Sequence, residues 1–80
     1  MHLRFVGIDP NTGDGESPTV WVDEDNADLV FQGWKADDET TEGCLKTGGI
    51  PDHEAVVRVP ARMIHIIREA CDAAERAQLR

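Results

Sequence analysis

The chain has 80 residues, of which 40% are apolar and 30% are charged, a balance typical of one small globular domain. It carries 16 acidic and 8 basic side chains, which gives a formal charge of −8. Because a negative charge opposes approach to DNA, RNA or an anionic membrane, the composition argues against direct binding of nucleic acid or membranes.

The beginning of the sequence, Met1 to Arg4, lacks the apolar segment of a signal peptide. No apolar run approaches the ~20 residues that a membrane helix needs, so we expect a cytoplasmic protein. Two cysteines, Cys44 and Cys71, are too few for a disulfide scaffold, and we expect both to be reduced thiols. Cys71 falls in an apolar helical pattern, which predicts that it packs as a small hydrophobic residue.

Runs of β-prone residues predict strands, which precede a single long helical pattern. The four predicted strands cover about residues 2–8, 19–23, 28–34 and 54–59. Simple alternation in the first strand places Leu3, Phe5 and Gly7 on one side of the sheet. A loop rich in turn formers follows over 9–18. An acidic hairpin turn joins the second and third strands, with Asn26 as the predicted left-handed residue.

Two helices are expected. A short one over 38–46 would begin at Asp37 or Asp38, whose side chains suit an N-cap. A long one over 60–78 has Pro60 at its start and an apolar face. That face comprises Met63, Ile66, Ile67, Ala70, Cys71 and Ala74. We therefore expect one α+β domain over 1–80, with a small antiparallel sheet of three to four strands and one long C-terminal helix packed on one face.

The hairpin suggests a binding surface. If Val22 pairs with Leu29, then Trp21 pairs with Val30 on the face that a single helix does not cover, with Trp34 further along. An exposed aromatic face of this kind favours a protein interface. The alternative is that the long 9–18 loop or the 38–45 segment covers the rings. The predicted protein-binding residues are Trp21, Val30 and Trp34, rimmed by Asp23, Glu24, Asp25 and Asp28.

Motifs for metal binding or catalysis are weak. The Asp9-containing loop has Val20 where a calcium loop needs a bidentate glutamate. Cysteines and histidines lack the paired spacing of a zinc site. Asp52, His53 and Glu54 place a base between two carboxylates, but adjacency alone does not make a catalytic triad. We expect no cofactor, no metal and no catalytic residues, with a small metal- or ligand-dependent enzyme at these three residues as the alternative.

Four segments of the chain resemble short actinobacterial proteins, especially from streptomycetes, that are commonly encoded beside Xre-type helix-turn-helix regulators. These segments are Gly7-Ile-Asp-Pro-Asn11, Pro18-Thr-Val-Trp-Val-Asp23, Asp28-Leu-Val-Phe-Gln-Gly-Trp34 and Glu54-Ala-Val-Val-Arg-Val-Pro-Ala-Arg-Met63. The resemblance covers most of the chain apart from residues 35–50, and it supplies no catalytic residues. It implies a small accessory protein that binds or modulates the neighbouring DNA-binding regulator, in an antitoxin-like pair or otherwise.

The expected function is therefore non-catalytic protein binding, with a helix-turn-helix transcriptional regulator as the partner. An acidic protein suits such a partner, because a helix-turn-helix protein is basic where it meets phosphate. A homodimer, in which the exposed face associates with a second copy, is the structural alternative.

Overall fold

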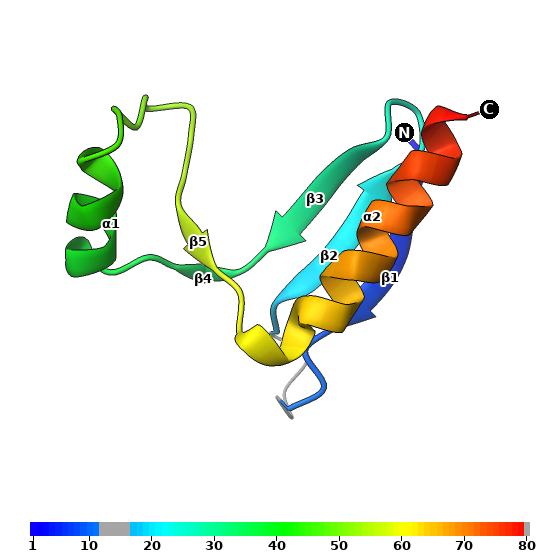
Figure 1. Ribbon diagram of the computed structural model, residues 1–80, viewed down its shortest axis with the longest axis horizontal. Helices are drawn as coiled ribbons and strands as arrows, with labels where there is room; N and C mark the ends of the chain where they lie inside the picture. Colours follow the sequence, from blue (N-terminus) through cyan, green and yellow to red (C-terminus); the bar gives the residue numbers. More distant parts are fainter. Residues whose placement is uncertain (12–16, 80) are drawn as a thin grey trace.

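A three-stranded antiparallel sheet and one long helix form the body of the protein (Figure 1). The computed structural model describes residues 1–11 and 17–79. Part of the predicted 9–18 loop, with most of its calcium-like motif, lies outside the described residues. The elements in chain order are β1 (Leu3–Ile8), β2 (Thr19–Asp23), β3 (Asp28–Gln32), β4 (Trp34–Lys35), α1 (Asp38–Leu45), β5 (Val57–Arg58), the 3-10 turn η1 (Ala61–Met63) and α2 (Ile64–Gln78).

The body has the predicted α+β architecture, with β2 between β1 and β3 and with α2 packed across one face. β2 supplies the centre of the core through Val20 and Val22, which are completely buried. The residues that α2 and η1 pack against them are Met63, Ile66, Ala70, Ala73 and Ala74. The alanines let the helix lie close to the sheet, because their side chains end at the methyl group.

The predicted apolar face of the long helix is correct at its centre and wrong at one edge. Ala70 and Ala74 are buried, and so is Ala73, which the spacing did not include. Cys71 is exposed, contrary to the prediction, and Cys44 is also a free, exposed thiol. Ala73 lies on the side of α2 next to β1, and Cys71 lies on the exposed flank of the helix.

A β-bulge in β1 changes the predicted facing of its residues. Phe5 pairs with Trp21 and Gly7 pairs with Val20, so Val6 is the extra residue. Val6 packs against the core, and a Cβ on Gly7 would lie 2.7 Å from a methyl carbon of Ile66. Gly7 therefore faces α2 and not the side of Phe5, as simple alternation had placed it.

The chain leaves the main sheet at Gly33. The predicted 28–34 strand ends at Gln32, and Trp34–Lys35 pairs instead with Val57–Arg58 in a separate two-stranded sheet. The predicted 54–59 strand is thus shorter and does not join the main sheet. A Cβ on Gly33 would lie 2.5 Å from the Arg58 carbonyl oxygen, so this close crossing of the two backbones requires glycine.

Two local predictions concern caps and turns. Asp37 is the N-cap of α1, and its carboxylate accepts a hydrogen bond from the Thr40 N–H at 2.8 Å. In the β2–β3 turn the left-handed residue is Ala27, with φ 66°, and not Asn26 as predicted. Asn26 stabilises the turn in another way, because its side-chain oxygen accepts a hydrogen bond from the Asp28 N–H at 2.9 Å.

Neither helix in the described part of the chain is long and apolar enough to cross a bilayer.

Replacing Gly7 by alanine should destabilise the protein. The new methyl group would lie within 3.1 Å of three Ile66 side-chain atoms, so it would overlap sterically with Ile66. Such overpacking typically costs about 1–3 kcal/mol, which urea denaturation would measure. Gly43→Ala is the control, because nothing lies within 4 Å of the position its Cβ would occupy. Equal stability of the Gly7→Ala variant and the native protein would contradict the close packing of β1 on α2.

Candidate protein-binding surface

Among the residues that the structure describes, no helix covers the face of the main sheet opposite α2 (Figure 1). Cross-strand pairing arranges its residues in three rows, because paired residues point to the same side. The central row is Phe5–Trp21–Val30, with Leu3–Asp23–Asp28 on one side of it and Ile8–Thr19–Gln32 on the other. We call this surface the open face. Its central row is apolar and aromatic and runs across the sheet from β1 to β3.

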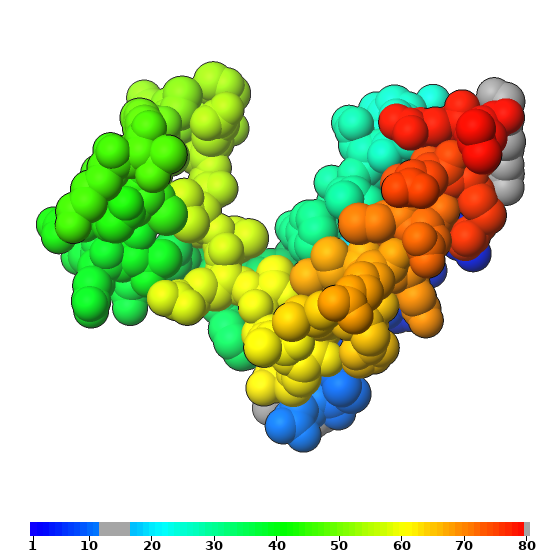
Figure 2. Space-filling model, viewed as in Figure 1, coloured from blue at the N-terminus to red at the C-terminus, as the bar shows by residue number. Residues whose placement is uncertain are grey.

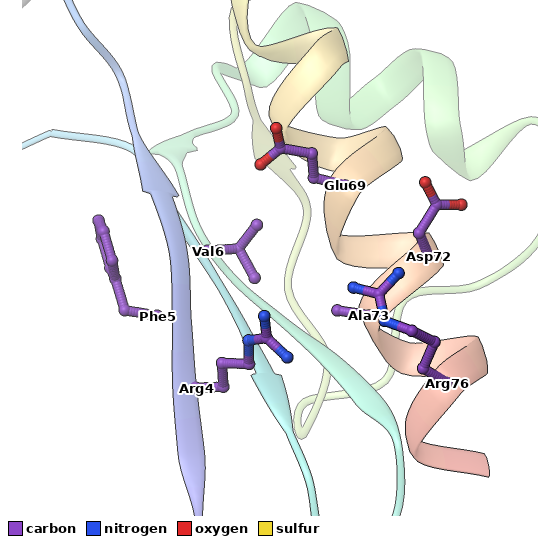
Figure 3. Close-up of a pocket in the computed structure, with 7 residues that line it drawn as sticks. All are labelled: Arg4, Phe5, Val6, Glu69, Asp72, Ala73 and Arg76. Carbon is purple, nitrogen blue, oxygen red and sulfur yellow. The ribbon is translucent and has the colours of Figure 1, made fainter. Parts of the chain in front are cut away.

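β1 contributes the most exposed part of the open face. Phe5 has 57% of its surface exposed, and Leu3 and Ile8 are also exposed. Figure 3 shows the Phe5 ring on the opposite side of β1 from the Val6 and Arg4 side chains, which point toward α2. Trp21 and Val30 are half-buried. A cluster of large apolar side chains at this level of exposure is typical of a binding surface.

The acidic residues of the β2–β3 turn border one end of the open face. Asp23 and Asp28 belong to its end row, and Glu24 and Asp25 lie in the turn itself. The turn is held to the start of β1, where the Glu24 N–H donates to the His2 carbonyl at 2.9 Å. It therefore presents its carboxylates at a defined place beside the apolar residues.

Asp25 also interacts with the first two residues of the chain. Its carboxylate lies 2.8 Å from His2 Nδ1 and 3.6 Å from the N-terminal amine. The hydrogen bond with Asp25 raises the pKa of His2 and lowers the pKa of the Asp25 carboxyl. Protonated His2 thus partly offsets the negative charge of the turn. As the pH rises and His2 loses its proton, this end of the open face becomes more negative.

The second predicted tryptophan lies elsewhere. Trp34 belongs to β4, in the separate sheet, and the Arg62 guanidinium carbon lies 5.9 Å from its ring centroid, within cation–π range. The structure thus groups Trp21 and Val30 with Phe5, and Trp34 with Arg62. Sequence reasoning did not include Phe5, Leu3 and Ile8 in the site. The glycine within the first strand was the one signal of a bulge that could have placed Ile8 on the same side as Phe5.

Arg62 also binds Asp9, and this pair lies at the end of the sheet away from the acidic turn. The Asp9 side chain is completely buried, and both of its oxygens accept hydrogen bonds from the Arg62 guanidinium at 2.6 Å. Arg62 holds the pKa of the Asp9 carboxyl below its ordinary value, against the opposing effect of burial. Asp9, the first position of the calcium-like loop, fixes the start of the helical segment to the end of β1.

Asp52, His53 and Glu54 lie in an exposed turn between α1 and β5. His53 Nε2 is 3.9 Å from a Glu54 carboxylate oxygen, and both side chains are mostly exposed to water. Over residues 1–11 and 17–79, no three His, Cys, Asp or Glu side chains are grouped to hold a metal ion. Asp52, His53 and Glu54 therefore lie at the surface of the molecule.

Comparison with protein-family models, with curated proteins and with solved structures gives no significant match to this chain.

The Asp9–Arg62 pair should make the stability of the folded protein depend on pH in the acidic range. A depressed carboxyl pKa stabilises the folded state above about pH 4, and this contribution is lost as the pH falls through the lower folded-state value. We expect Asp9→Asn to lower Tm at neutral pH and to reduce the fall in Tm between about pH 5 and pH 2. Asp52→Asn, in the exposed turn, should leave the native profile unchanged. A native pH profile in Asp9→Asn would contradict the role assigned to the pair.

Proposed function

We propose that the protein is a non-catalytic protein-binding module and that the open face is its binding surface. The observation that carries the proposal is the row Phe5–Trp21–Val30, an aromatic and apolar centre left exposed by a fold with one covering helix. Large aromatic side chains dominate the binding energy of protein interfaces when a partner removes them from water.

The acidic border indicates the chemistry of the partner. Asp23, Glu24 and Asp28 lie at one end of the apolar centre, and their negative charge suits a partner whose contact surface is apolar in the middle and basic at the rim. A helix-turn-helix regulator has a basic surface where it meets DNA phosphates. We therefore propose such a regulator as the partner, in line with the resemblance to proteins encoded beside Xre-type regulators. Binding there would compete with DNA, as an antitoxin-like partner would.

The two free cysteines indicate the compartment in which partner binding takes place. Cys44 and Cys71 form no disulfide with each other and are both exposed. Because exposed thiols persist in a reducing compartment, we propose the cytoplasm as the site of action.

Substitutions in the central row should weaken partner binding. The probe is a purified Xre-type helix-turn-helix regulator, titrated by calorimetry. We expect Phe5→Ala and Trp21→Ala each to raise Kd by about 10- to 100-fold, as for truncation of an interface aromatic. Phe5→Ala should leave Tm nearly unchanged, because the ring is mostly exposed. Trp34→Ala, outside the open face, should leave Kd within about threefold. Native affinity in both open-face variants would contradict the proposal.

The acidic border should make binding depend on salt. Glu24→Gln combined with Asp28→Asn removes two charges beside the open face, so the affinity should fall and the remaining affinity should vary less with ionic strength. Asp38→Asn with Glu39→Gln removes the same charge from α1 and is the matched control. If both double variants showed the native salt dependence, the border would have no part in binding.

A further inference from the structure

Residues 33–58 form an arm that projects from the body of the protein, and Val59 after it packs against the core of the body (Figure 1). The arm contains β4, α1 and β5, and all of its residues are described. None of its side chains is buried, so the arm has no core of its own. Leu45 and Val57 have 50% and 42% of their surfaces exposed. A helix and a two-stranded ribbon without buried side chains gain little from the hydrophobic effect, which is the main stabilising term in folding.

The arm makes the chain larger and more exposed than a compact monomer. The accessible surface is 5958 Å², whereas a compact protein of 8.8 kDa exposes about 4,800 Å². The radius of gyration is 14.1 Å, against about 11.6 Å for a compact domain of 80 residues. The excess, about 1,200 Å², exceeds the ~800 Å² that each partner buries in a standard interface.

The two long flanks of α2 differ in chemistry. On the side of β1, the residues around a recess of about 200 Å³ include the charged side chains of Arg4, Glu69, Asp72 and Arg76 (Figure 3). Helical spacing places Ile64, Ile67 and Cys71 on the other flank, toward β3. Ile64 is 49% exposed, and on the helix-facing side of β3 Leu29 and Phe31 are exposed as well. We call this second surface, comprising Leu29, Phe31, Ile64, Ile67 and Cys71, the apolar flank.

The apolar flank borders the space between the body and the arm. Figure 2 shows a V-shaped notch with α2 and β3 on one side and the arm on the other. β3 is the edge strand on this side of the main sheet, so its outer backbone groups also face the notch. The notch thus has an apolar wall on the body, and the arm on its other side carries the exposed Leu45 and Val57.

The base of the arm is fixed in a position that keeps the notch open. The Trp34 ring lies against Arg62, which is held by the buried Asp9 carboxylate. Gly33 lies against the Arg58 carbonyl, and Trp34 pairs with Arg58 across the ribbon. For the arm to close onto its own flank, these contacts would have to break. The apolar flank is therefore available to the arm of another molecule.

We propose that the apolar flank binds the arm of a second copy of this chain, so that two copies exchange arms in a symmetric dimer. Each chain supplies one flank and one arm, which is the reciprocal arrangement that a twofold axis requires. The exposed area in excess of a compact monomer is sufficient for such an interface. The open face lies on the opposite side of the sheet and stays free, so this inference is independent of the proposed function.

Sedimentation equilibrium of the purified full chain tests the proposal. We expect a concentration-dependent mass that approaches twice 8.8 kDa. Ile64→Glu should raise the dimer dissociation constant by about tenfold or more, because it places a charge in the interface. The variant should still fold, since residue 64 is half-exposed and a glutamate suits the first turn of a helix. Circular dichroism checks the fold. Ile8→Glu, the same change on the open face, should leave dimerisation unchanged.

Cys71 provides a second readout in a Cys44→Ser background. Its reaction with an aromatic disulfide reagent should slow as the protein concentration rises, and it should not do so in Ile64→Glu. A monomer at every concentration would overturn the proposal. Small-angle scattering would then show whether the radius of gyration is well below 14.1 Å, as it would be if the arm folded onto its own flank. A dimer unaffected by Ile64→Glu but disrupted by Ile8→Glu would overturn the proposal too, and would place self-association on the open face.

Discussion

The packing of one helix against one face of a three-stranded sheet is the interaction on which the rest of the structure depends. Val20 and Val22 of the central strand are sealed by α2, and the alanines of that helix bring it close to the sheet. A single helix covers one face only, so the opposite face keeps Phe5 and Trp21 in contact with water. The same interaction that stabilises the body therefore creates the surface proposed for partner binding.

A second constraint acts at the other end of the sheet. The buried Asp9 carboxylate binds Arg62, and Arg62 lies against Trp34 at the root of the arm. These contacts connect the end of β1, the start of the helical segment and the first residue of β4. They fix the direction in which the chain leaves the body after Gly33. The apolar flank and the open face lie on opposite sides of the main sheet, so a dimer built on the flank would carry two open faces.

Local patterns were sufficient to predict much of the body. A run of β-prone residues located β2, the spacing of apolar residues located α2, and the Val22–Leu29 pairing correctly placed Trp21 opposite Val30. Asp37 was one of the two residues expected to cap α1. In each case the structure depends on residues close in sequence, or on a hairpin whose register a short turn determines.

The features that sequence reasoning missed depend on contacts between distant residues. Simple alternation cannot locate the bulge at Val6, which moves Gly7 to the side of Ile66 and Ile8 to the side of Phe5. The break at Gly33 arises from the close approach of the Arg58 carbonyl, 25 positions later. Trp34 consequently left the predicted surface and Phe5 joined it. The partner of Asp9 is equally distant, and nothing near either residue in the sequence connects Asp9 with Arg62.

The most direct test of the central claim is a nuclear magnetic resonance titration with an Xre-type helix-turn-helix regulator, the proposed partner, following the aromatic and methyl signals of the labelled protein. The account predicts that the signals of Phe5, Trp21 and Val30 shift or broaden, while those of the core residues Val20 and Val22 on the covered side of the sheet change little. Perturbation confined to the arm or to α2, with the open-face signals unchanged, would contradict it.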